Sequence, residues 1–210
     1  MSTLDDAART QLTDRLLAAD ELEGLTFDGL ALESADLGGK ALTNCTFRRC
    51  KLSESTWSKT RLEDCVFDAC DLTRLSPAGL AMRDVEMRAS KLMGVDFSRV
   101  GTLPLVSFED CDLRYAAFVG LTLRKTRFLR CTIVEANFVD TDLAEARFDD
   151  STFTGTRFSG CELRAASFAG ARDLLLDPAR NKTKGTKIPV EAAVNLARFH
   201  GMKVVGYVED

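Results

Sequence analysis

The sequence repeats with a period of five residues over most of its length. Large apolar residues recur at every fifth position from Leu22 to Phe97, and Pro77 is the one exception. After one extra residue the same column resumes at Phe108 and continues to Phe168 without a break. A period of five matches neither the 3.6-residue repeat of an amphipathic helix nor the two-residue alternation of a strand. It predicts a coil with four sides, one pentapeptide per side and twenty residues per turn.

A second column lies two positions before each large apolar residue and holds small or medium-sized side chains. We expect both columns to point into the coil, where the small residues leave room for the large ones. An odd number of cysteines without any Cys-x-x-Cys spacing indicates neither a disulfide framework nor a zinc site. Buried thiols of this kind should be unreactive. All seven cysteines belong to this column: Cys45, Cys50, Cys65, Cys70, Cys111, Cys131 and Cys161.

Residues of like size should form ladders along the coil axis, because residues one turn apart stack at the ~4.8 Å spacing of neighbouring strands. One ladder runs from Phe27 to Phe168 and contains Met87, and a second runs from Phe118 to Phe158. Only Phe199 of the thirteen phenylalanines lies outside the column of large residues. The predicted fold class is therefore all-β, a right-handed quadrilateral parallel β-helix of about seven coils with a C-terminal helix cap.

Both ends of such an array need caps, because each coil rests only on its neighbours. We predict an N-terminal helical cap over residues 1–20, the β-helix over residues 21–174, and a C-terminal helix and strand over residues 175–210 that cap and dimerise. Residues 181–188 are expected to form either a loop or a degenerate last coil. A short strand is expected over residues 202–208.

The C-terminal helix should begin at Pro189 and end before Gly201. Its apolar residues lie on two nearly opposite sides, so it needs two covers. One cover is the terminal coil, and the other is predicted to be a second subunit related by a twofold axis, the commonest symmetry of homo-oligomers. The predicted dimer interface consists of Val194, Leu196, Ala197, Phe199 and Met202.

Catalytic and cofactor chemistry is not indicated by the sequence. His200 is the only histidine, which excludes a catalytic triad and a multi-histidine metal site. No glycine-rich phosphate-binding loop is present, since the glycines at 24, 29, 39, 94, 120, 155, 160 and 170 fall in the corner column of the repeat. We therefore expect a protein that is not an enzyme and has no cofactor and no metal.

The net charge and the hydropathy of the chain argue against two classes of partner, nucleic acids and membranes. The net charge of −4 and the isoelectric point near 5.2 argue against a nucleic-acid binder, which would carry a basic stripe. No run of 18 or more apolar residues is present, and the N-terminus lacks the basic and apolar segments of a signal peptide. We expect no membrane partner and a cytoplasmic location.

The surface of the coil is the remaining place for function. An acidic cluster is the predicted partner-binding face, although such clusters are commonly just solvated: Asp140, Asp142, Glu145, Asp149 and Asp150. An apolar group lies at nearby outward positions: Val119, Leu129, Val134 and Val139. Pro77 and the segment Gly101 to Pro104 interrupt the repeat, either as a loop that a partner recognises or as a tolerated irregularity.

Units such as CDLRY, ANFVD, TDLAE and CELRA resemble the A(D/N)LXX repeat of the pentapeptide-repeat family, over most of the chain. The stretch DPARNKTKGTKIPVEAAVNLARFHGMKVVG is similar to the tail through which MfpA and Qnr type proteins dimerise. The resemblance implies a DNA-mimicking homodimer that binds DNA gyrase or a related type II topoisomerase and protects it from quinolones or other gyrase poisons. The alternative is a rigid protein-protein interaction scaffold without a topoisomerase partner.

Overall fold

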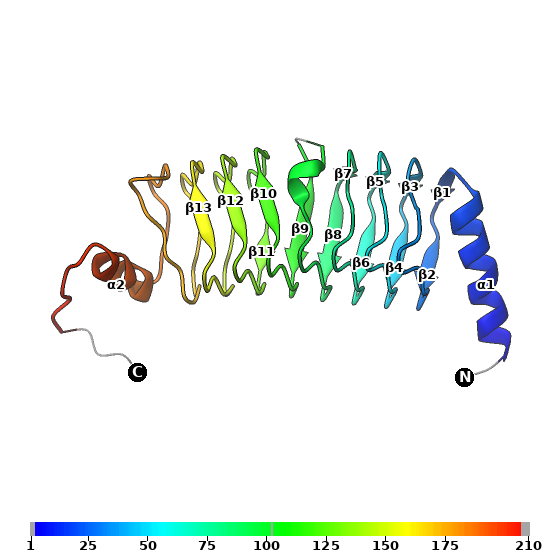
Figure 1. Cartoon of the computed structure of the whole chain (residues 1–210), viewed down its shortest axis with the longest axis horizontal. Helices are drawn as coiled ribbons and strands as arrows, with labels where there is room; N and C mark the ends of the chain where they lie inside the picture. The colour runs from blue at the N-terminus through cyan, green and yellow to red at the C-terminus, as the bar shows by residue number, and fades with distance from the viewer. Residues whose placement is uncertain (1–2, 102, 207–210) are drawn as a thin grey trace.

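Each pentapeptide forms one side of a four-sided coil, as the repeat predicts. The structure, a computed structural model, describes residues 3–101 and 103–206. Stacked coils build a rod of about seven turns, with one helix at each end (Figure 1). The large column and the small column are both buried, while the residues between them face solvent. The predicted parallel β-solenoid is therefore confirmed.

The corners of the coil are left-handed residues. Gly120 has φ +67° and Asp140, one coil further on, has φ +50°. A left-handed residue reverses the inward and outward alternation and turns the chain by one corner. Asp and Asn tolerate this conformation better than most non-glycine residues, which suits the corner column. Corner side chains consequently point away from the core.

Strands occupy three of the four sides, which we number in chain order. The first side contains four strands: β1 (Glu21–Glu23), β3 (Ala41–Thr43), β5 (Arg61–Glu63) and β7 (Ala81–Arg83). The second side contains six: β2 (Thr26–Asp28), β4 (Thr46–Arg48), β6 (Val66–Asp68), β8 (Val85–Arg88), β9 (Val106–Glu109) and β11 (Phe128–Leu129). The third side is joined by isolated parallel bridges. The fourth side contains three: β10 (Ala117–Val119), β12 (Asn137–Val139) and β13 (Arg157–Ser159).

Aromatic ladders fill the core. On the second side, the ring of Phe47 lies 4.7 Å from that of Phe67, and the two planes differ by 3°. Rings of the fourth side meet them edge-on, as Phe138 meets Phe128 at 6.0 Å and 86°. Such offset stacks and edge contacts are the preferred arrangements of aromatic rings. The ladders thus join neighbouring coils and opposite sides into one core.

The small column is held by hydrogen bonds as well as by packing. The Cys65 thiol donates to the Leu42 carbonyl oxygen at 3.3 Å, and the Thr141 hydroxyl donates to the Phe118 carbonyl oxygen at 2.9 Å. Both acceptors lie in the preceding coil. Cysteine, serine and threonine suit this column because they are small and carry one donor.

The two interruptions of the repeat lie on neighbouring coils. A 3₁₀-helix, η1 (Phe97–Arg99), follows Asp96, and the strand register across it is 21 residues, with Met87 opposite Phe108. Pro77 is buried directly below this segment, where Gly79 N–H donates to the Arg99 carbonyl oxygen. A proline has no N–H for the ladder, so it fits a coil whose next neighbour is irregular.

The N-terminal helix α1 (Thr3–Ala18) covers the first coil (Figure 1). Leu16 is fully buried against the core, and Leu12 is partly buried. Lys40 lies in the small column yet is almost fully buried, and its ammonium donates to the Leu17 and Ala19 carbonyl oxygens at 2.9 and 2.8 Å. A cation at the C-terminal end of a helix satisfies carbonyls that lack an intrahelical partner.

The solenoid continues past the predicted end at residue 174. Lys182 forms a parallel bridge with Glu162, and Lys187 forms one with Ser167. Asn181 occupies the small column, where its side-chain oxygen accepts the Cys161 N–H at 3.0 Å. Residues 181–188 are therefore a degenerate last coil, and the boundary at 174 was placed too early because the apolar period ends before the coiling does.

The C-terminal helix α2 (Val190–Phe199) follows Pro189, in agreement with the sequence signals. It lies beyond the last coil at the end of the rod (Figure 1). The predicted strand over 202–208 is wrong for residues 202–206, which form no strand, and residues 207 and 208 lie outside the described part.

Candidate partner-binding surface

The predicted acidic face is a belt around the rod rather than a stripe along it. Asp140 is the corner before the first side, Asp142 lies on that side, and Glu145 is the corner after it. Asp149 lies on the second side, and Asp150 is the corner after it. The five carboxylates thus follow half a turn of one coil. They are brought together along the chain but do not form a continuous acidic column.

Basic side chains neutralise much of this belt. Arg124 lies 3.3 Å from both Asp142 and Glu145, across the gap between two coils. Arg147 lies 2.6 Å from Asp149 on the same side. Burial alone would raise the pKa of Asp149, but hydrogen bonds from Ser167 and Arg147 hold it below its usual value. Asp142, Glu145 and Asp149 each lie next to a basic side chain, so the local field is mixed.

Ion pairs follow two repeating geometries elsewhere on the rod. Within one side, the residues before and after the buried centre meet, as Glu162 meets Arg164 at 2.8 Å. Between coils, residues about one turn apart meet, as Arg83 meets Glu63 at 3.2 Å. Each exposed pair contributes only ~0–1 kcal/mol. Their main effect is to interleave positive and negative charge on three sides.

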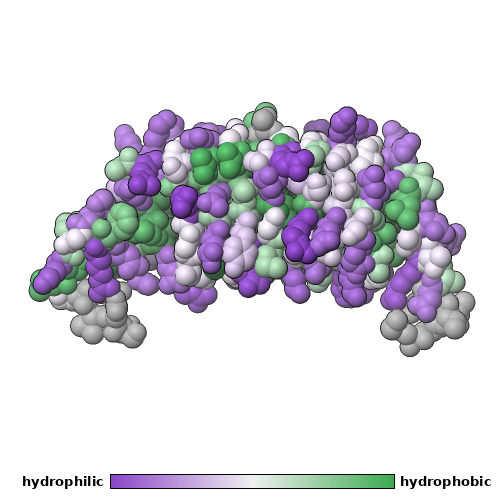
Figure 2. All heavy atoms as spheres, in the orientation of Figure 1, coloured by the Kyte–Doolittle hydropathy of each residue, from purple (hydrophilic) through white to green (hydrophobic). Residues whose placement is uncertain are grey.

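The fourth side differs from the other three. Among the residues that the structure describes between positions 36 and 160, no ion pair involves an outward residue of this side. Val119 is 39% exposed and lies opposite Val139 in the register of β10 and β12. Leu129 and Val134 are half-buried on other sides, so the predicted apolar group is divided. Figure 2 shows an apolar area over the part of the rod that contains β10 and β12.

The predicted dimer residues are not equally accessible. Phe199 and Met202 are more than half exposed, and Leu196 and Ala197 are half-buried. Val194 is only 5% exposed in the single chain, so it has little surface to offer a second subunit. The helical spacing alone could not show which apolar side faces the terminal coil.

The described residues show no cluster of side chains that could bind a metal ion, and His200 has a structural contact. In the parts of the chain described here, no group of three or more His, Cys, Asp or Glu side chains is placed to hold a metal ion. His200 Nε2 lies 4.0 Å from Asp177 Oδ1, so this side chain links α2 to the end of the solenoid. No helix within residues 3–101 and 103–206 is long and apolar enough to cross a bilayer.

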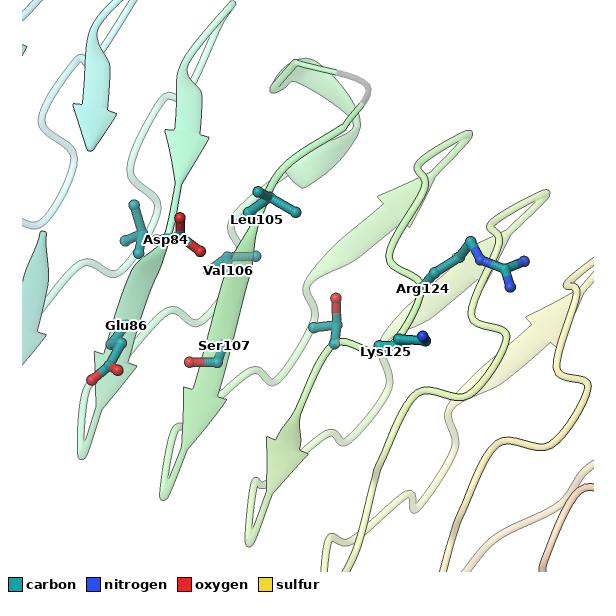
Figure 3. Close-up of a pocket in the computed structure, with 9 residues that line it drawn as sticks. Asp84, Glu86, Leu105, Val106, Ser107, Arg124 and Lys125 are labelled. Carbon is teal, nitrogen blue, oxygen red and sulfur yellow. The ribbon is translucent and has the colours of Figure 1, made fainter. Parts of the chain in front are cut away.

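Sequence reasoning missed a depression at the corner between the first and second sides, beside the insertion (Figure 3). It is lined by Asp84, Leu105, Val106, Arg124 and Lys125 among others, and has a volume of about 400 Å³. Its signal in the sequence is the single extra residue between two perfect repeats. That signal marks the position but does not show that a hollow forms there.

Two family models match the sequence. "Pentapeptide repeat region" matches residues 102–172, and "Pentapeptide repeats (8 copies)" matches residues 42–76. Together they cover about half of the chain, and the solenoid has the expected four-sided coil. The chain belongs to the pentapeptide-repeat family. No curated protein matches the sequence significantly.

Solved structures share the fold at low identity. A trypsin-treated variant of QnrB1, a plasmid-mediated fluoroquinolone resistance protein, is 19% identical with a TM-score of 0.60, over 88% of this chain and 90% of that chain. HetL, a pentapeptide repeat protein involved in heterocyst differentiation regulation in Nostoc sp. strain PCC 7120, is 15% identical with a TM-score of 0.42, over 84% and 92%. At these identities the likeness to QnrB1 concerns the fold alone.

Proposed function

We propose that this protein is a non-catalytic binding protein whose partner is a type II topoisomerase such as DNA gyrase, and that binding protects the enzyme from quinolones or other gyrase poisons. The observation that carries the proposal is the rod itself, about seven coils long, whose fold is shared with the fluoroquinolone resistance protein QnrB1 over most of both chains. A rigid rod presents long flat sides, which suit recognition of an extended surface.

The partner-binding face proposed for this contact is the acidic belt from Asp140 to Asp150. Asp140 and Asp150 are corner residues and project from the coil. Corner positions are the most accessible points of a four-sided rod, so they can meet a partner first. A basic surface on the topoisomerase, of the kind that contacts DNA phosphates, would be complementary to them.

A second candidate is an interaction scaffold whose partner is not a topoisomerase. The observation that favours it is the charge pattern, because mixed pairs such as Arg124 with Glu145 replace the continuous acidic columns that duplex mimicry needs. On the fourth side, the neighbouring Val119 and Val139 offer a partner an apolar contact that costs little to desolvate.

We also propose that the working form is a homodimer joined through α2. The exposed side chains of Phe199 and Met202, with half-buried Leu196 and Ala197, form the contact. A twofold interface would place the same residues opposite one another and cover apolar area that the single chain leaves in water.

The decisive experiment is supercoiling by purified DNA gyrase, with and without a quinolone, across a titration of this protein. The topoisomerase proposal is supported if the protein, at concentrations up to micromolar, inhibits gyrase supercoiling or protects it from the quinolone. If the protein has no effect on gyrase or on a related type II enzyme, the topoisomerase proposal is contradicted and the interaction scaffold is favoured. The fold assignment does not depend on this result.

The face is tested in the same assay with charge variants. Asp140→Lys together with Asp150→Lys should weaken the effect on gyrase by about tenfold or more, because two corner carboxylates become cations. Asp64→Lys is the matched control, since Asp64 is also a corner residue but lies four coils away from the belt. Equal effects of both variants would contradict the assignment of the face.

A further inference from the structure

The fourth side carries an exposed apolar patch in the coils of β10 and β12. Val119 is 39% exposed and lies opposite half-buried Val139 in the strand register. Ala117 and Asn137 lie opposite each other in the same way. Apolar colour gathers over this part of the rod in Figure 2. Two β-branched side chains thus lie next to each other on an outward sheet face, where polar residues are usual.

An exposed aromatic ring borders the patch. Tyr115 occupies the corner before β10, is 52% exposed and has φ +61°. Among the described residues it is the one aromatic side chain at a left-handed corner. This conformation is uncommon for a bulky residue. Aromatic side chains are enriched at protein contacts, and their faces also attract cations. The ring therefore adds a contact that suits an apolar or a basic partner residue.

Two acidic corner residues flank the patch in the coil of β12. Glu135 precedes this strand and Asp140 follows it, and both are exposed. Within the described part of the chain, neither carboxylate takes part in an ion pair or a side-chain hydrogen bond. Asp142 and Glu145 differ, because both pair with Arg124. A cation of a partner can therefore meet Glu135 or Asp140 without breaking an ion pair of the rod.

The two acidic side chains leave the apolar patch uncovered. A methyl group at Gly160 would lie less than 3.0 Å from Asp140 Oδ1, and one at Gly155 would lie 3.1 Å from Glu135 Cγ. Both acidic side chains therefore lie over the corner glycine of the next coil rather than across the strand. Glycine permits this close approach because it has no side chain.

The patch itself is acidic. The two segments that form it, residues 115–120 and 135–140, contain two acidic residues and no basic one. In the coil before the patch, Asp96 and Arg99 have opposite charges, and in the coil after it Arg157 lies opposite Asn137. Apolar area between unpaired carboxylates is complementary to an apolar group between cations.

We propose that this patch binds a protein segment that presents an apolar side chain between two basic side chains. The apolar side chain lies on Val119 and Val139, and the basic side chains meet Glu135 and Asp140. An extended segment fits, because its first, third and fifth side chains face the same way and span ~13 Å. The inference rests on the fourth-side surface of the scaffold candidate, and it does not require a topoisomerase.

The test titrates two synthetic five-residue peptides into the full-length protein with ¹³C-labelled valine methyl groups. Both peptides have a central leucine between two serines, and their end residues are either both arginine or both glutamate. The arginine peptide should shift the methyl signals of Val119 and Val139 with a dissociation constant on the order of 1 mM. The methyl signals of Val66, on the second side, should not move. Gyrase is absent from this test, so its outcome is separate from that of the topoisomerase proposal.

Matched variants distinguish the patch from general surface binding. Glu135→Gln should weaken binding of the arginine peptide about fivefold, whereas Glu54→Gln, in the same corner column four coils earlier, should leave it unchanged. Val119→Lys should abolish binding, and Ser58→Lys, at the same outward position three coils earlier, should not. Equal affinity for the two peptides, equal effects within either pair of variants, or no methyl shift with the arginine peptide would overturn the proposal.

Discussion

Single residues in this rod are stabilised by their counterparts one turn away. Phe128 is fully buried between the rings of Phe108 at 5.0 Å and Phe148 at 4.8 Å. Any residue of the large column thus supports two neighbours as well as itself. A side chain removed from the middle of a ladder leaves a cavity that rigid coils cannot close.

We predict that Phe128→Ala lowers the free energy of unfolding by about 3 to 5 kcal/mol. Denaturant unfolding followed by circular dichroism measures the change. Leu129→Ala, at the adjacent outward position, is the control and should cost less than about 1 kcal/mol. A loss below about 1 kcal/mol for Phe128→Ala would contradict the role of the ladder.

Lys40 is a second residue whose role depends on a distant partner. We predict that Lys40→Ala lowers the free energy of unfolding by about 1.5 to 3 kcal/mol, because two charge-assisted hydrogen bonds to the end of α1 are lost. Hydrogen exchange should show faster exchange of the α1 amides in this variant. Lys51→Ala, at an exposed position, is the control, and unchanged exchange in Lys40→Ala would refute the capping role.

The reactivity of the cysteine thiols depends on both their pKa and their exposure to solvent, and the two factors oppose each other at Cys45. The neighbouring Cys65 thiol lowers the pKa of Cys45, which by itself favours the reactive thiolate. The Cys45 side chain is nevertheless 0% exposed, and burial raises the pKa of Cys161. We predict no reaction of the native protein with Ellman's reagent and seven equivalents after unfolding. Rapid labelling of one native thiol would show that the coil opens near Cys45.

At the scale of elements, α2 is the one helix with a largely exposed aromatic side chain among the described residues. Phe199 is 59% exposed, and Val190 on the first turn is 72% exposed. Solvent exposure of several large apolar groups on one short helix and its tail is typical of an interface.

We predict that Phe199→Asp converts the proposed dimer into a monomer, because a buried carboxylate without a partner would be costly at the interface. Multi-angle light scattering gives the molar mass directly. Glu191→Lys, an exposed change on the same helix, should remain dimeric. A mass that is the same for the wild type and both variants would remove α2 as the dimer contact.

At the scale of the whole molecule, continuity across the insertion decides whether the rod is one unit. The six-stranded second side crosses the break, and β8 and β9 pair over four residues there. The third side also crosses it, through the bridge between Lys91 and Asp112. Strong coupling between neighbouring coils keeps a repeat array cooperative.

We therefore predict a single unfolding transition for the whole solenoid. Far-ultraviolet circular dichroism, which reports all coils, and fluorescence of Trp57, which lies before the break, should give the same midpoint in denaturant. Two separated transitions would show that the coils before and after the insertion unfold independently.

The amino-acid sequence by itself determined the four-sided coil, the two inward columns and the aromatic ladders. A strict period of five leaves the chain one way to bury its large residues, so each pentapeptide encodes its own orientation. Cysteines such as Cys111 could be assigned to the interior for the same reason, and the structure confirms their burial.

The tertiary structure alone decided what the surface offers. Residues such as Arg124 and Glu145 meet only because coils stack with a defined register, and that pairing changes an acidic cluster into a mixed field. The burial of Val194 and the hollow beside Leu105 likewise depend on how separate segments pack. The local repeat specifies which side chains face outward, but neighbours from other coils determine which of them are paired, covered or free to bind.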